Sequence, residues 1–124
     1  MKYLCLAYGA EADWKALSPA EQQALLAQDE SLRKQGALMS AVETRVVTVR
    51  AWNGAPEVTE GAFAQPRVPL AGFSVIEADD VSELIERVAQ TPCARAKGAI
   101  EIRPIRVINE EQWLRLALTD GASG

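Results

Sequence analysis

The predicted strands of this chain are apolar on both faces, and no other feature limits its possible folds as strongly. In the first strand Leu4 and Leu6 point to one face while Tyr3 and Cys5 point to the other, because successive side chains of a strand alternate. Residues 70–78 are apolar on both faces in the same way. Strands of this kind are typical of sheets that are covered on both sides. The fold must therefore supply two covers for one sheet.

Two helices of ordinary length are predicted. One begins at Ser18, whose capping box is completed by Glu21, and it ends before Gly36. The other begins at Asp80, carries apolar residues at helical spacing, and ends at Pro92. Two helices can cover one face of a sheet but not both.

The predicted elements follow the order strand, helix, strand, strand, strand, helix, strand, helix. They span residues 2–8, 18–35, 41–52, 56–59, 70–78, 80–91, 98–107 and 109–118. Residues 9–17 are expected to form a loop, and Asn53-Gly54 is expected to take positive φ at both positions of a tight turn. With the arm at 56–59 as a hairpin insertion, the order becomes β-α-β-β-α-β. This is the ferredoxin-like α+β fold with an antiparallel sheet.

We expect two parts in the chain: one domain over residues 1–108, and a C-terminal helix with a flexible tail over residues 109–124. The economical cover for the second sheet face is another copy of the chain, packed face to face in a two-fold dimer. Two alternatives remain open. The C-terminal helix could fold over the open face of its own chain, or it could embrace the partner.

Composition excludes several classes of function. The chain has 13 basic and 17 acidic residues and a net charge of −4, so it offers no basic face to a nucleic acid. It contains no histidine, the commonest general base near neutral pH and the commonest metal ligand. We therefore expect no nucleic-acid partner, no metal and no cofactor.

The two cysteines are too few for a structural zinc site or a disulfide scaffold. Cys5 lies in an apolar strand and is expected to be a buried, inert hydrophobe. Cys93 follows Pro92 at the predicted end of a helix, away from a helix N-terminus that would lower the pKa of its thiol. No segment reaches the roughly 18–20 apolar residues of a membrane span, and the first apolar run is too short for a signal peptide. We expect a cytoplasmic protein with no membrane partner.

Carboxylates are the remaining candidates for acid–base chemistry, because burial can raise the pKa of a carboxyl group towards neutral pH. The catalytic candidates are Glu43, Glu60 and Glu101. The expected ligand-binding residues are Tyr8, Trp14, Phe63, Arg67 and Arg103. Arginine offers a planar fork for a carboxylate or phosphate, and an aromatic residue on a loop of small residues can contact a ligand. The alternatives are that the acids are solvated or ion-paired, and that Phe63 and Trp14 only pack.

Six segments, taken in order, carry a resemblance to a known family. They are residues 1–9, 18–21, 58–64, 70–73, 77–80 and 99–105. Together they resemble the YCII-related proteins of the DGPF type, whose Asp-Gly-Pro-Phe signature stands here as Glu60-Gly61-Ala62-Phe63. The resemblance implies a ferredoxin-like fold that pairs into a dimeric α/β barrel with a cleft between sheets and helices. Some relatives carry a His–Asp pair suspected of catalysis, which a chain without histidine cannot form.

Three functions remain open. The leading hypothesis is a small homodimeric domain that binds a small organic ligand, anionic or aromatic, in a cleft, with or without simple acid–base chemistry. The second is a non-enzymatic accessory module that works with a regulatory partner through the helix at 109–118. The third is a structural dimer without a ligand. The sequence leaves open whether the protein is an enzyme.

Overall fold

The computed structural model describes residues 1–64, 66–106 and 111. The strands are β1 (Lys2–Tyr8), β2 (Leu38–Ala41), β3 (Val47–Arg50), β4 (Glu57–Glu60), β5 (Leu70–Glu77) and β6 (Ala99–Pro104). The helices are α1 (Glu11–Lys15), α2 (Pro19–Lys34), α3 (Val81–Val88) and α4 (Pro92–Arg95). The predicted C-terminal helix and the division after residue 108 lie outside the described residues. None of the helices within those residues could cross a membrane.

The main sheet has four antiparallel strands in the order β2-β5-β1-β6. With the β3–β4 hairpin set aside, the chain runs β1-α2-β2-β5-α3-β6, which confirms the predicted ferredoxin-like α+β fold with a hairpin insertion. β1 is a central strand, as its two apolar faces predicted. Its Cys5 pairs with Ser74 on one side and Ile102 on the other.

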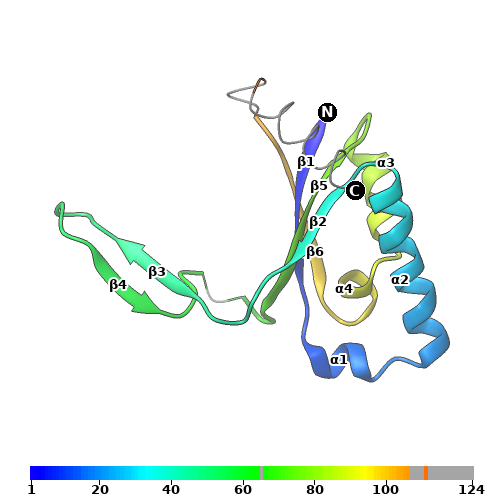
Figure 1. Cartoon of the computed structure of the whole chain (residues 1–124), viewed down its shortest axis with the longest axis horizontal. Coiled ribbons are helices and arrows are strands. Elements are labelled where there is room, and N and C mark those ends of the chain that lie inside the picture. Colours follow the sequence, from blue (N-terminus) through cyan, green and yellow to red (C-terminus); the bar gives the residue numbers. More distant parts are fainter. Residues whose placement is uncertain (65, 107–110, 112–124) are drawn as a thin grey trace.

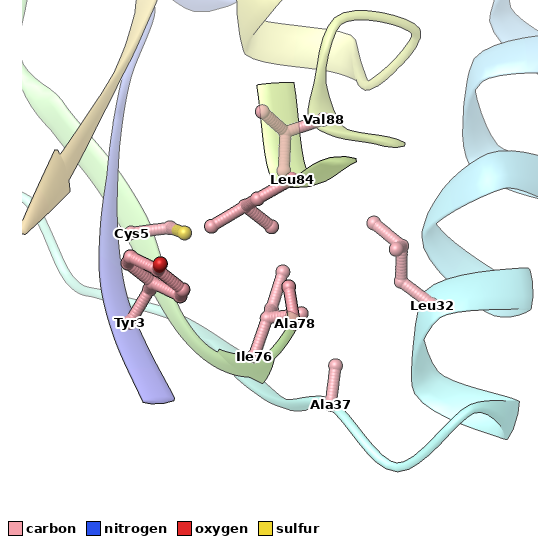
Figure 2. Packing of buried hydrophobic residues seen from close by; sticks show 8 residues of the cluster. All are labelled: Tyr3, Cys5, Leu32, Ala37, Ile76, Ala78, Leu84 and Val88. Carbon is pink, nitrogen blue, oxygen red and sulfur yellow. The ribbon is translucent and has the colours of Figure 1, made fainter. Parts of the chain in front are cut away.

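The helices all lie on one side of this sheet (Figure 1). Figure 2 shows Leu32 of α2 and Leu84 of α3 pointing towards Tyr3 and Cys5 of β1 and Ile76 of β5. These five side chains are buried. Such burial contributes about 1.5–3 kcal/mol for each large aliphatic side chain, and it is what holds the helices to the sheet.

No helix within the described residues covers the opposite face of the sheet, which is called the open face below. It carries the alternate residues of the same strands, among them Leu4, Leu6, Phe73 and Val75, which are only partly buried. Apolar residues therefore lie on both faces, as predicted, while the described helices cover one of them. Nothing within the described ranges tests whether a second copy covers the open face.

Local signals in the sequence correctly predicted where the two main helices begin. The Ser18 hydroxyl accepts a hydrogen bond from the Glu21 amide, and the Glu21 carboxylate accepts one from the Ser18 amide, both at 3.2 Å. The Asp80 carboxylate accepts from the Glu83 amide at 2.9 Å. Gly36 follows the end of α2 with φ of +104°, the left-handed conformation that glycine adopts at little cost.

Three predicted boundaries were wrong. Residues 41–52 do not form one strand, because the chain leaves the sheet after β2 and pairs again only from Val47. The predicted loop at 9–17 contains the short helix α1, which includes Trp14. Pro92 does not mark the end of a helix, since α3 ends at Val88 and Pro92 opens α4. Proline suits the first helical turn, where no amide donor is needed.

The turn of the hairpin also differs from the prediction. The Gly54 amide donates to the Ala51 carbonyl at 3.0 Å, so Trp52 and Asn53 are the central residues of the turn. Gly54 has φ of +90°, whereas Asn53 does not take positive φ. The Asn53 side chain instead accepts a hydrogen bond from the Ala55 amide at 3.3 Å. The position of this turn was predicted correctly, but its type was not.

The β3–β4 hairpin forms a sheet of its own that projects away from the main sheet, on the side opposite the helices (Figure 1). Val49 faces Val58 across the two strands, and both are exposed. Trp52 at the tip is 86% exposed, with the Arg50 guanidinium 5.4 Å from the centre of its ring. Trp52 therefore does not pack into the body of the protomer.

Candidate functional site

A groove of about 890 Å³ lies where the hairpin joins the main sheet. Its walls are the segment at 42–46, which leads into the hairpin, and the segment at 62–70, which returns to the sheet. It is also lined by Tyr8 at the end of β1 and by alternate residues along β6. All but two of the site residues predicted from the sequence line this groove: Tyr8, Glu43, Phe63, Arg67, Glu101 and Arg103.

The described part of the chain provides no partner for two of these side chains. Phe63 is 73% exposed, so it does not anchor its loop to the core, which was the alternative considered for it. Arg67 is exposed, and no hydrogen bond or ion pair to a described residue engages it. A guanidinium that no described residue engages, in the same groove as an exposed ring, can hold an anion or an aromatic molecule. The binding role of both residues stays a prediction.

Glu101 and Arg103 lie two residues apart on the open face of β6 and form an ion pair. Arg103 Nε donates to Glu101 Oε1 at 2.6 Å, and Arg103 Nη2 lies 2.5 Å from the same oxygen. The structure thus shows the ion-paired alternative for Glu101. Glu43, another of the three catalytic candidates, is exposed in the groove. Its catalytic role stays a prediction.

The remaining two predicted residues lie elsewhere. Glu60 is exposed on β4, opposite Val47 of β3, and does not line the groove. Trp14 is half-buried in α1, where its backbone carbonyl accepts a hydrogen bond from the Gln22 side chain at 2.9 Å. The structure does not bring either residue together with the others.

A second cavity, of about 290 Å³, lies on the covered side of the sheet between α2, α4 and the strands. Its polar lining includes Asp29, Cys93, Ser74 and Thr91. Gly98 helps to place α4 here, because any side chain at this position would collide with the Tyr8 carbonyl oxygen where the chain passes β1. The cavity and the groove lie on opposite sides of the sheet.

Asp29 was not among the site residues predicted from the sequence, although the sequence contains a signal for its position in this cavity. It lies four residues after Leu25 and three before Leu32, both of which are buried. Residues at this spacing share one face of a helix, so a carboxylate interrupts the apolar stripe of α2. The sequence interpretation considered only carboxylates on strands and loops.

Burial raises the pKa values of Asp29 and Cys93, two ionisable groups that line this cavity. It raises the pKa of Asp29 above that of a free aspartate, against the opposing effect of the nearby Arg33. The pKa of the Cys93 thiol is raised as well, first by burial and then by the charge of Asp29. The prediction that Cys93 lies at the end of a helix, away from a helix N-terminus, was wrong, because Cys93 is the second residue of α4. Its raised pKa still means that it is not an activated nucleophile. Burial also raises the pKa of Cys5, consistent with the inert role expected for it.

Within the ranges described, no group of three or more Cys, Asp or Glu side chains is arranged to hold a metal ion. The class of protein is a ferredoxin-like α+β domain with one covered sheet face, one open face and a hollow on each side. The family model of the YCII-related domain matches residues 1–109, and the chain belongs to this family. The resemblance noted in the sequence is thereby confirmed.

Among solved structures, the chain is similar to 5-chloro-2-hydroxyhydroquinone dehydrochlorinase (TftG) from Burkholderia phenoliruptrix AC1100, determined in complex with 2,5-dihydroxybenzoquinone. The two sequences are 17% identical, and the match covers 86% of this chain and 94% of the other with a TM-score of 0.45. A search of curated proteins found no match.

Proposed function

We propose that this protein is a homodimer that binds a small organic molecule, anionic or aromatic, in the groove on the open side of its sheet. The observation that carries the proposal is the groove itself, in which Arg67, engaged by no described residue, lies with the exposed Phe63 and with Tyr8. A volume of about 890 Å³ falls within the range of about 300–1,000 Å³ that is typical of ligand pockets.

The residues of the groove suit a ligand with a carboxylate and a ring. The Arg67 guanidinium can donate two parallel hydrogen bonds to a carboxylate. Phe63 and Tyr8 supply aromatic surfaces against which a flat molecule can stack. Glu43 is the one carboxylate of the groove without an ion pair among the residues described, and simple acid–base chemistry, if the protein performs it in this groove, would fall to Glu43.

The open face supports the dimer. Its centre is apolar, and its edges carry opposite charges: Lys2 pairs in register with Glu77, and Arg103 lies beside Glu101. A surface with both signs of charge around an apolar centre can complement itself across a two-fold axis. A second copy would also cover the side chains that no described helix reaches. We place the dimer in the cytoplasm, where both thiols would stay reduced.

Two measurements test the proposal. Sedimentation at micromolar concentration should give the mass of a dimer, and benzoate should raise the melting temperature of the wild-type protein. Arg67→Ala should abolish the response to benzoate while leaving the melting temperature without ligand unchanged. Arg95→Ala, which removes an exposed arginine on α4, is the matched control and should respond like the wild type. A monomer, or an equal benzoate response in Arg67→Ala, would contradict the proposal.

A further inference from the structure

We propose that the cavity between α2, α4 and the sheet is a second site, separate from the groove, where Asp29 transfers protons to and from a small uncharged molecule with an enolisable carbonyl group. The inference goes beyond the ligand groove and does not depend on the dimer, because the described residues of one protomer form the cavity.

The lining of the cavity favours one acid–base group. Asp29 is its only carboxylate among the described residues. The Thr91 hydroxyl donates to the Val88 carbonyl at 2.6 Å, so its proton is already engaged. The Ser74 hydroxyl is hydrogen-bonded to the Cys5 thiol. The other lining residues are mostly aliphatic, which keeps the surroundings of Asp29 poorly solvated.

The charges around Asp29 select against ionic ligands. Asp29 and Arg33 lie one turn apart on α2 and line the cavity with opposite charges, so together they offer no net charge to an anion or a cation. Arg33 is in addition held by an ion pair with Glu30 at 2.7 Å. The volume of about 290 Å³ is close to the lower limit of about 300 Å³ for ligand pockets. A small uncharged molecule is therefore the ligand that fits.

The position of Asp29 also suits it as a base. A carboxylate whose pKa is raised by burial binds a proton more strongly than a free aspartate, so it is the better base once it is ionised. Ionisation of Asp29 is opposed by burial and aided by Arg33, while the thiols of Cys93 on α4 and Cys5 on β1 face the same space uncharged. We expect the rate of proton transfer to rise with pH as Asp29 ionises.

The step needs no co-reactant. Ionised Asp29 removes a proton from the carbon next to the carbonyl group, and the electron pair of that C–H bond forms a C=C bond. The carbonyl π electrons move to oxygen and give an enolate, to which the protonated Cys93 thiol of the same cavity can donate a hydrogen bond. The Asp29 carboxyl group then returns its proton to the carbon or delivers it to the oxygen.

The location of binding can be tested with cyclohexanone, a small uncharged ketone, and protein labelled with ¹³C at the methionine methyl groups. The chain has two methionines: Met39 lines the cavity, and Met1 is exposed. We expect millimolar cyclohexanone to shift the Met39 signal and leave the Met1 signal in place. An unchanged Met39 signal, or equal shifts of both signals, would overturn the proposed site.

Proton transfer can be followed as deuterium incorporation next to the carbonyl group of cyclohexanone in D₂O. We expect the wild-type protein to catalyse this exchange, and Asp29→Asn to slow it about 100-fold, the lower end of general acid–base contributions. Glu86→Gln, an exposed acid on α3, is the matched control and should exchange like the wild type. Equal exchange in Asp29→Asn and in the wild type would overturn the role of Asp29.

A second variant keeps the test decisive if Asp29→Asn does not fold. Met39→Trp places a larger side chain in the cavity and leaves Asp29 in position, so it should slow the exchange by a similar factor. Full exchange in folded Met39→Trp would show that the reaction occurs elsewhere. A protein that fails to respond to benzoate but shows Asp29-dependent exchange would contradict the groove and support the cavity, so the two proposals can fail separately.

Discussion

The two faces of the main sheet are built from the same strands but differ in how deeply their side chains are buried. On the covered face, Tyr3, Cys5 and Ile76 are at most 3% exposed beneath the helices. On the open face, their neighbours Leu4 and Val75 are only partly buried. Because neighbouring residues of a strand point to opposite sides, one sequence of alternating positions builds a folding core on one side and, on the other, a surface that no described helix covers.

The two hollows differ in the same way. The groove on the open side offers charged and aromatic groups to solvent, and its acid Glu101 is neutralised by an adjacent arginine. The cavity on the covered side holds Asp29 where burial raises its pKa. Depth in the fold, rather than residue type, therefore decides which carboxylate is suited to proton transfer.

The largest expected effect tests the covered face. Leu84 of α3 is 0% exposed, so Leu84→Ala should lower the free energy of unfolding by about 2–5 kcal/mol through lost burial and the cavity left behind. Its neighbour Ile85 is 52% exposed, and Ile85→Ala should lower it by much less. Urea unfolding measures both. Equal losses would mean that the helices are not attached through the face seen here.

The next effect tests the open face. Phe73→Lys places a charge at the apolar centre of that face and should raise the dissociation constant of the proposed dimer at least about 30-fold, or about 2 kcal/mol. The mass from sedimentation should fall to that of a monomer at micromolar concentration. Lys97→Ala, at an exposed position beyond α4, is the control and should leave the mass unchanged. If Phe73→Lys stays dimeric, another surface holds the dimer.

A smaller effect tests how the helix layer is anchored. Ser18→Ala removes the side-chain acceptor of the α2 capping box and should lower the free energy of unfolding by about 1 kcal/mol. Ser82→Ala on α3 is a suitable control because this exposed serine lies inside the helix, one residue after its start. A loss in Ser18→Ala no greater than that in Ser82→Ala would show that the cap does not stabilise the layer on the covered face.

The sequence predicted the fold well where local chemistry determines it. The cap at Ser18 and the two apolar faces of β1 depend on neighbours in the chain, and both are confirmed. The exit from the sheet after Ala41 could not be read in this way, because Val42 to Val46 continue the alternation of a strand. Only tertiary pairing decides that β3 pairs with β4 instead of extending β2.

The site residues could also be predicted only in part. Residues from three separate parts of the chain, such as Tyr8, Arg67 and Arg103, were grouped from their chemistry, and the structure brings them to one groove. Trp14 and Glu60 were grouped for the same reason and lie apart from it. Asp29 could have been found only by asking which charged residue lies on the apolar face of α2. Its environment also depends on α4, which the sequence interpretation did not predict.

The smallest effect concerns the pH dependence of stability and tests the carboxylate on the covered side of the sheet. Since folding raises the pKa of Asp29, the folded state holds a proton there that the unfolded chain releases above a pKa near 3.8. Stability should therefore fall as pH rises from about 4 through the raised pKa.

Asp29→Asn removes this dependence, so its stability relative to the wild type should be greater at pH 7 than at pH 4. Urea unfolding of the wild type and Asp29→Asn at both pH values makes the comparison. A wild-type advantage over Asp29→Asn that grows with pH would mean that the folded state favours the ionised carboxylate, contrary to its burial.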